Sequence, residues 1–278
     1  MTIVTRFAPS PTGLLHLGHA CSALLAWQAA QPDGRFLLRI EDIDTGRSRE
    51  EFVAAAERDL AWLGLTWEQP VRRQSRHFGD YRAALARLDA MNVLYPCFCT
   101  RADIAAEIAR SPTAPHGPDG VLYPGTCRTL SPAERAQRIA TGAPYAVRLD
   151  VARAQSHSAA LTWRDLDRGE QTAQPETLGD VVLARKDVPT SYHLAVTVDD
   201  ALQGVTLVTR GDDLFHATHI HRLLQALLDL PVPVWRHHRL LTDAAGRRYA
   251  KRDKALTLQA LRESGRTPAE VRALAGVP

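Results

Sequence analysis

The sequence predicts an α/β fold in which a parallel sheet is interrupted by an inserted subdomain. Short apolar segments alternate with longer segments of helical periodicity through residues 2–94, a pattern typical of parallel sheets whose strands are joined by helices. Between Cys97 and about Asp187, prolines and glycines crowd together and regular periods are few, which indicates an insertion. Strand and helix patterns then return. With 278 residues, the chain is long enough for about two domains of ordinary size.

The first part of the chain is divided into short strands and amphipathic helices. Apolar and β-branched residues predict strands at residues 2–7 and 36–40. Helical spacing of apolar residues predicts helices at 17–29, 50–63 and 81–94. A loop rich in proline and glycine joins the first strand to the first helix.

Two short helices are expected inside the insertion, because the sequence contains two N-terminal capping signals. Thr100 is followed three positions later by Asp103, and Ser131 is followed by Pro132 and Glu134. A hydroxyl residue with an acid three positions on forms a capping box, and proline suits the first helical position.

The pattern after the insertion predicts the second half of the sheet. Residues 192–198 and 205–209 have the composition of strands, and 218–230 form a strongly apolar helical segment. From residue 247 the chain is basic and helical, with a final helix start at 267–270.

Composition says little about partners and favours a cytoplasmic protein. Lys and Arg number 34 against 31 Asp and Glu, so the net charge of +3 is compatible with a local basic face but does not establish one. The N-terminus lacks a basic start followed by a long apolar run, and no segment is apolar over the length of a bilayer. No membrane partner is expected.

His16, Gly18 and His19 lie where the first strand is predicted to turn into a helix. A helix N-terminus presents unpaired N–H groups and the positive end of a dipole, so phosphate is the expected ligand there. Gly18 has no side chain, which permits close approach of a nucleotide. The alternative is a pair of surface histidines near a turn.

Charged residues also follow the predicted strands. Arg39 and Glu41 alternate along one strand, which puts them on the same side, and Arg210 ends a later strand just before Gly211. Ligands of open α/β sheets gather at the carboxyl ends of strands. Ordinary surface charge clusters are the alternative interpretation.

Residues 6–13, Arg-Phe-Ala-Pro-Ser-Pro-Thr-Gly, with the His16 to His19 segment, resemble the signature of class I aminoacyl-tRNA synthetases of the glutamyl and glutaminyl branch. The resemblance implies a Rossmann-like catalytic domain in two halves, 1–95 and 187–245. Between them it implies a zinc-binding, tRNA-contacting subdomain at 96–186, and after them a basic loop and short helices at 246–278.

The same resemblance implies activation of glutamate with ATP and a role for each matching residue. Binding glutamate requires arginine for carboxylate and an acid for ammonium, because a buried unpaired charge is costly. The residues implied for glutamate are Arg6, Ala8, Ser10, Glu41, Tyr192 and Arg210. Those implied for ATP, with Mg²⁺, are His16, Gly18, His19, Arg248 and Lys251, of which His16, His19 and Lys251 are the expected catalytic residues.

The segment from Arg248 to Arg252 departs from the basic loop of that family. Arginine stands in place of the first lysine and Ala250 in place of serine, whereas Lys251 is kept. The charge needed to neutralise a triphosphate is retained, and a hydroxyl is lost.

Cys97, Cys99 and Cys127 fall in one segment with unequal spacing, which favours a metal site over a disulfide framework. Three thiolates leave one position of a tetrahedral zinc site. The resemblance implies one structural Zn²⁺ with Tyr123 as the fourth ligand, and His116 is the chemically ordinary competitor. Three buried free thiols are the alternative.

Only 27 residues follow Lys251, fewer than the roughly 50 of a small domain, so we expect no anticodon-binding domain. This layout resembles the truncated glutamyl-queuosine tRNA(Asp) synthetases. It implies a monomer that forms the adenylate without tRNA and transfers L-glutamate to queuosine in the anticodon stem-loop of tRNA(Asp). The alternatives are a minimal synthetase charging a tRNA 3′ end, a non-catalytic tRNA-binding paralogue, and a nucleotidyltransferase.

Overall fold

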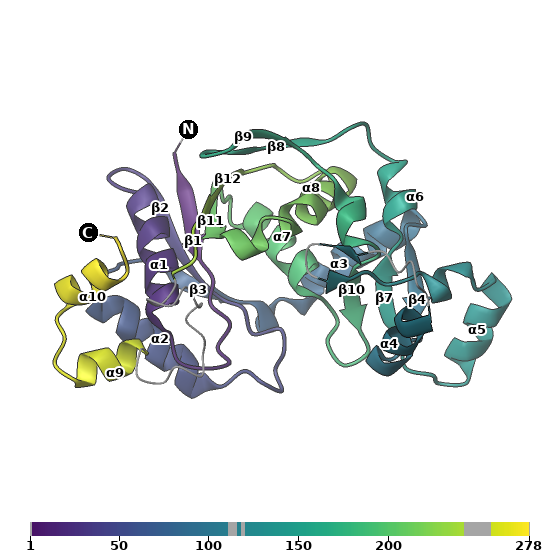
Figure 1. Cartoon of the computed structure of the whole chain (residues 1–278), viewed down its shortest axis with the longest axis horizontal. Coiled ribbons are helices and arrows are strands. Elements are labelled where there is room, and N and C mark those ends of the chain that lie inside the picture. Colours follow the sequence, from purple (N-terminus) through teal and green to yellow (C-terminus); the bar gives the residue numbers. More distant parts are fainter. Residues whose placement is uncertain (1, 111–115, 118–119, 242–256, 278) are drawn as a thin grey trace.

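The computed structural model describes residues 2–110, 116–117, 120–241 and 257–277 (Figure 1). The first half of the sheet is parallel, with the strand order β1–β2–β3. Its elements are β1 (Val4–Phe7), α1 (Leu17–Ala29), β2 (Arg35–Ile40), α2 (Glu50–Trp62) and β3 (Glu68–Arg73). The helices and strands predicted before residue 63 are therefore confirmed.

A second sheet begins beside β1, where the backbone N–H of Thr206 donates to the carbonyl of Val4. Its strand order is β11–β12–β8–β9, and β11, β12 and β8 are parallel. The strands are β11 (Leu207–Gly211), β12 (Val234–His238), β8 (Thr162–Asp165) and β9 (Gly169–Thr172). Strands β8 and β9 lie within residues 96–186 in the sequence, and in space they extend this second sheet.

The rest of residues 96–186, the central segment, forms a further sheet with short helices at the right of Figure 1. Three antiparallel strands make its sheet, in the order β10–β7–β4. Its elements are β4 (Leu94–Cys97), α4 (Arg101–Arg110), β5 (His116–Gly117), β6 (Gly120–Val121), α5 (Pro132–Ala140), β7 (Ala146–Leu149), α6 (Val151–Gln155) and β10 (Val182–Arg185). Both predicted capping boxes form, at Thr100 and at Ser131.

The prediction of a strand at residues 192–198 is wrong, because these residues begin helix α7 (Tyr192–Leu202). The apolar alternation there fits a short strand as well as a buried helix. Two features select the helix: Ser191 accepts a hydrogen bond from the N–H of Leu194 as its N-cap, and α7 packs between α3 (Phe78–Ala90) and α8 (Ala217–Leu227). Tyr192 is therefore placed in the first turn of a helix.

Two short C-terminal helices close the core around α1. They are α9 (Leu258–Glu263) and α10 (Pro268–Leu274), and Leu258 and Val271 are buried against the α1 and α2 side of the first sheet. Thr267 caps α10, as predicted. The 3₁₀ helices are η1 (Gln74–Arg76), η2 (Thr126–Thr129), η3 (Pro175–Leu178) and η4 (Asp212–Leu214).

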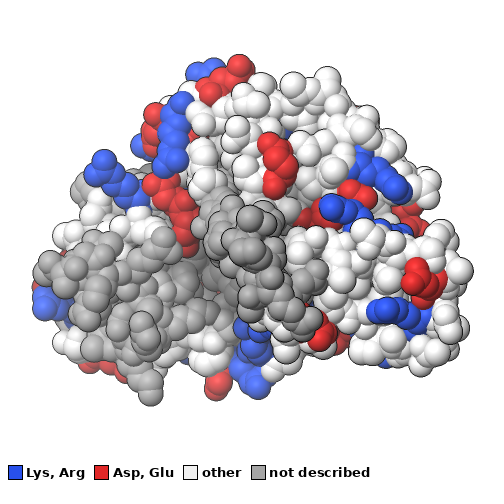
Figure 2. Space-filling model, turned by 45° about the vertical axis from the view of Figure 1, so that its right-hand side comes forward, with Lys and Arg blue, Asp and Glu red and all other residues white. Residues whose placement is uncertain are grey.

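None of the helices in the described residues has the length and apolarity needed to cross a bilayer. On the face shown in Figure 2, Lys and Arg side chains are interspersed with Asp and Glu. This distribution agrees with the small net charge.

Candidate active site

A cavity of about 560 Å³ lies at the carboxyl ends of β1, β2 and β11. Among its lining residues are all the described residues that the sequence assigned to glutamate or ATP. These are Arg6, Ala8, Ser10, His16, Gly18, His19, Glu41, Tyr192 and Arg210. Arg248 and Lys251 lie outside the described residues.

The histidines of this cavity form the start of helix α1. Nδ1 of His16 accepts from the N–H of Gly18 at 3.1 Å, and Nδ1 of His19 accepts from the N–H of His16 at 3.1 Å. The pair is thus a reciprocal cap, a structural role that the sequence did not reveal. Because Nδ1 of each ring is an acceptor, a neutral ring carries its proton on Nε2, and that proton is a suitable donor to a phosphate oxygen.

Gly18 leaves room for the capping histidine His16. A Cβ atom at this position would lie 3.1 Å from Cε1 of His16 and 3.2 Å from its Nδ1. A side chain at position 18 would therefore press on the capping histidine.

A buried ionic network connects Arg6 to Glu41. Arg6 Nε donates to Asp200 Oδ1 at 2.9 Å, and Arg39 donates to the same oxygen at 2.7 Å and to Glu41 Oε1 at 3.2 Å. The charge of Arg6 is therefore paired within the protein. Burial raises the pKa of Glu41, against the opposing effects of Arg39 and Arg6, so its carboxylate would be stabilised by a further cation.

Asp199, the neighbour of Asp200, fixes this network to the rest of the fold. Its carboxylate accepts from Arg72 Nε at 2.8 Å, from Gln74 Nε2 at 2.8 Å and from the Tyr81 hydroxyl at 2.9 Å. Neither aspartate was identified from the sequence. Two adjacent acids in the apolar segment of α7 were the available signal, since buried carboxylates require cationic partners.

Arg210 differs from Arg6 because the described side chains that hydrogen-bond to its guanidinium are neutral. Its guanidinium donates to Tyr192 Oη at 3.4 Å, to Thr218 Oγ1 at 2.5 Å and to His237 Nε2 at 3.1 Å, and it lies 3.3 Å from His221 Nδ1. Within the described residues, no carboxylate forms an ion pair with it, although it is only 5% exposed. Burial lowers the pKa of Arg210, so the site favours an added anion.

The histidines around Arg210 do not add charge at neutral pH. Burial and the positive charge of Arg210 lower the pKa of both His193 and His237 to about 4, and that of His221 well below its ordinary value. The cavity therefore contains a buried cation at Arg210, and Glu41, whose pKa burial raises, on its wall.

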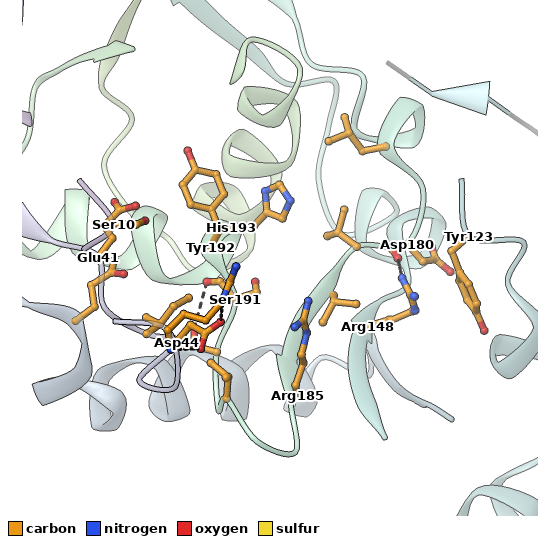
Figure 3. Close-up of a pocket in the computed structure, with 18 of the residues that line it drawn as sticks. Ser10, Glu41, Asp44, Tyr123, Arg148, Asp180, Arg185, Ser191, Tyr192 and His193 are labelled. Atoms are coloured by element: carbon orange, nitrogen blue, oxygen red, sulfur yellow. Dashed lines mark hydrogen bonds and ion pairs between the residues drawn. The ribbon is translucent and has the colours of Figure 1, made fainter. Parts of the chain in front are cut away.

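A second cavity of about 730 Å³ shares Ser10, Glu41 and Tyr192 with the first. It extends from these residues to Arg148 and Tyr123 of the central segment (Figure 3). A ligand in this cavity would therefore reach the wall that both cavities share.

The thiols of Cys97, Cys99 and Cys127 come together beside the second cavity, with their sulfur atoms all within 4.8 Å of one another. Tyr123 Oη lies 3.6 Å from Cys99 Sγ and accepts a hydrogen bond from the N–H of Cys127 at 2.8 Å. Sulfur atoms of a tetrahedral zinc site are about 3.8 Å apart for Zn–S bonds of about 2.3 Å. The three cysteines can hold a metal ion; the side chain of His116 lies outside the described residues.

Comparison with known proteins gives consistent matches over almost the whole chain. Residues 2–275 match the catalytic-domain model of the class I tRNA synthetases for glutamate and glutamine. The glutamyl-Q tRNA(Asp) synthetase of Rhodobacter capsulatus is 50% identical over 281 residues, covering 99% of this chain and 100% of that protein. The protein of the same name from Symbiobacterium thermophilum is 46% identical, covering 96% of this chain and 83% of its own length.

Solved structures agree with this match. A glutamate-tRNA synthetase from Elizabethkingia anophelis has a TM-score of 0.77 and 26% identity over 91% of this chain. A glutamate tRNA ligase from Elizabethkingia meningosepticum, in complex with its amino acid, has a TM-score of 0.75 and 27% identity. The chain spans about half the length of these two proteins, 53% and 52%.

Proposed function

The chain belongs to the class I tRNA synthetases of the glutamate and glutamine branch, and we propose that it activates L-glutamate with ATP and transfers it to tRNA(Asp). The main support for this proposal is that one cavity is lined by both Arg210 and Glu41. Arg210 is a buried cation that forms no ion pair with a carboxylate in the described residues. The side-chain carboxylate and the ammonium group of glutamate match this pair of charges, and its α-carboxylate is the group that is activated.

In the proposed complex, Arg210 and the Tyr192 hydroxyl bind the side-chain carboxylate of glutamate, and Glu41 binds its ammonium group. Arg6 supports this end of the cavity through its pair with Asp200, at 2.9 Å. Ala8 and Ser10 line the same cavity. The side-chain carboxylate and the ammonium group then each have a partner of opposite charge, as burial requires.

ATP is proposed to bind with its phosphates at the N-terminus of α1, near His16, Gly18 and His19. The helix dipole and the imidazole donors favour the phosphate charge. Arg248 and Lys251 are assigned to the triphosphate from the sequence, with Mg²⁺ accompanying ATP. The α-carboxylate oxygen attacks the α-phosphorus, its bond to pyrophosphate breaks, and glutamyl adenylate forms without tRNA.

The acceptor is proposed to be the queuosine base at the wobble position of tRNA(Asp), presented by the anticodon stem-loop. The shared name of two relatives that this chain matches at 50% and 46% identity supports this choice. The larger cavity offers a route, because it meets the glutamate cavity at Ser10, Glu41 and Tyr192. We propose a monomeric, cytoplasmic enzyme.

The cysteine cluster is proposed to bind one structural Zn²⁺ through Cys97, Cys99, Cys127 and Tyr123. When bound, zinc would link the loop after β4 to the segment around η2 and would take no part in catalysis. The part of residues 96–186 outside β8 and β9 would then act as the zinc-binding, tRNA-contacting segment, between catalytic halves at 1–95 and 187–245, with the basic loop and helices at 246–278; β8 and β9 extend the second sheet of the catalytic part.

The location of the transferred glutamate tests the proposal. Purified enzyme is incubated with ATP, labelled glutamate and tRNA(Asp) that contains queuosine, and nuclease fragments are analysed by mass spectrometry. We expect glutamate on the anticodon-loop fragment, and none with tRNA(Asp) that lacks queuosine. Glutamate on the terminal adenosine would instead identify a synthetase of the ordinary kind, and no glutamate-dependent ATP–pyrophosphate exchange would identify a binding protein.

A further inference from the structure

A row of three buried side chains crosses the second sheet and ends at the glutamate cavity. Arg210 on β11 is the register partner of His237 on β12, and Asp165 ends the next strand, β8. Asp165 Oδ2 lies 2.7 Å from His237 Nδ1, and Arg210 Nε donates to His237 Nε2 at 3.1 Å. The side chains of Asp165 and His237 are completely buried.

The hydrogen bonds define which nitrogen of His237 carries the proton. Arg210 can only donate, so Nε2 of His237 must accept, and the proton lies on Nδ1, where it is donated to Asp165. Burial would raise the pKa of Asp165, but hydrogen bonds from His237 and from the N–H of Asp167 lower it below the ordinary value. The pKa of about 4 at His237 keeps the ring neutral at pH 7.

This arrangement keeps the charge of Arg210 available in a way that a direct ion pair would not. Arg6 is held by a carboxylate in contact with its guanidinium, at 2.9 Å from Asp200. Arg210 is held by the neutral ring of His237, and the carboxylate of Asp165 stands one ring further away. His237 therefore orients the guanidinium of Arg210 without neutralising its charge. A carboxylate in direct contact would compete with the substrate for the same N–H donors.

We infer that Asp165 and His237 are positioning residues that orient Arg210 toward the side-chain carboxylate of glutamate, so that this enzyme prefers glutamate to glutamine. The inference rests on the proposed function. Neither residue lines the glutamate cavity. Both act through Arg210, which would bind an amide more weakly than a carboxylate.

Two substitutions of His237 separate orientation from mere packing. The amide of His237→Asn reaches the place of Nδ1, so it keeps the contact with Asp165 and loses the acceptor for Arg210. The longer His237→Gln places an amide oxygen near Nε2 and restores that acceptor. Glutamate-dependent ATP–pyrophosphate exchange would give the KM for glutamate and for ATP, and the ratio of kcat/KM for glutamate over glutamine.

For His237→Asn we expect the KM for glutamate to rise about tenfold, the loss of one hydrogen bond to a charged group. In His237→Asn the KM for ATP should stay near the wild-type value, and the preference for glutamate over glutamine should fall. His237→Gln should recover most of the wild-type KM for glutamate and most of that preference. KM does not depend on the concentration of active enzyme, so partial unfolding leaves this readout intact. Asp165→Asn should act like His237→Asn, because an amide at position 165 allows the imidazole to turn its donor toward Arg210.

An unchanged KM for glutamate in His237→Asn and Asp165→Asn, or an equal rise in His237→Gln, would overturn the inference. The proposed function fails separately, if the unmodified enzyme shows no glutamate-dependent exchange.

Discussion

Replacing Arg210 by Gln should nearly abolish the use of glutamate while leaving the protein at least as stable as before. Glutamine is neutral and of similar length, so it removes the charge and keeps part of the packing. Arg210 is 5% exposed, and hydroxyl groups and an imidazole accept its hydrogen bonds. The substrate carboxylate would thus be its first anionic partner in the described structure.

The size of the effect follows from that pairing. Removing one partner of a buried, hydrogen-bonded ion pair costs about 3–5 kcal/mol, which corresponds to a loss of roughly a hundredfold to a few thousandfold in kcat/KM for glutamate. In the absence of substrate, the substitution has the opposite effect on the stability of the protein. The buried charge destabilises the free protein, and the lost hydrogen bonds are worth about 1 kcal/mol each, so Arg210→Gln should raise the free energy of unfolding by about 1–2 kcal/mol.

ATP–pyrophosphate exchange at varied glutamate concentrations gives kcat/KM for glutamate. Urea denaturation without substrate gives the free energy of unfolding. Arg236→Gln is the matched control, because Arg236 lies on β12, is exposed and pairs with Asp167 on the surface. It should change neither measurement appreciably. Wild-type exchange kinetics in Arg210→Gln would refute the assignment of Arg210 to the substrate carboxylate.

Three further results are expected. Glu41→Gln should raise the KM for glutamate about tenfold, because the amide cannot pair with the ammonium group; an effect confined to ATP would contradict this role. Metal analysis should find one zinc per chain, and a chelator should lower the melting temperature and slow transfer to tRNA more than activation; a protein free of metal would refute this. Burial raises the pKa of Asp59 to about 6, against the opposing charge of Arg262, so the folded state favours the protonated form. The protonated carboxyl group of Asp59 contributes its full stability below the unfolded pKa of 3.8, and this contribution is lost as the pH rises through the folded pKa of about 6. Asp59→Asn should therefore gain stability over the wild type between pH 4 and pH 7, by up to about 3 kcal/mol in urea denaturation; a difference independent of pH would contradict this.

Residues that depend on local geometry could be predicted from the sequence. His16, Gly18 and His19 stand where a strand turns into a helix, and Glu41 and Arg210 stand at strand ends. Ligands gather at the carboxyl edge of a parallel sheet, so these residues could be predicted to lie near one another. In the structure they line one cavity. The resemblance to the class I synthetases, carried by residues 6–19, agrees with the family match over residues 2–275.

Residues that depend on distant partners could not be predicted. Arg6 and Asp200 are 194 positions apart, and Asp165 and His237 are 72 apart. No local period relates such pairs, and only the packing of α7 against the first sheet and the pairing of β8 with β12 bring them into contact. The error at residues 192–198 concealed Asp200 further, because the buried face of a helix cannot be read from an assumed strand.

A crystal structure with L-glutamate and a non-hydrolysable ATP analogue would test the assignment of the cavity most directly. The side-chain carboxylate of glutamate should contact the Arg210 guanidinium, its ammonium group should contact Glu41, and its α-carboxylate should face the α-phosphorus beside His16 and His19. Glutamate bound in the reverse direction, or outside this cavity, would contradict the assignment.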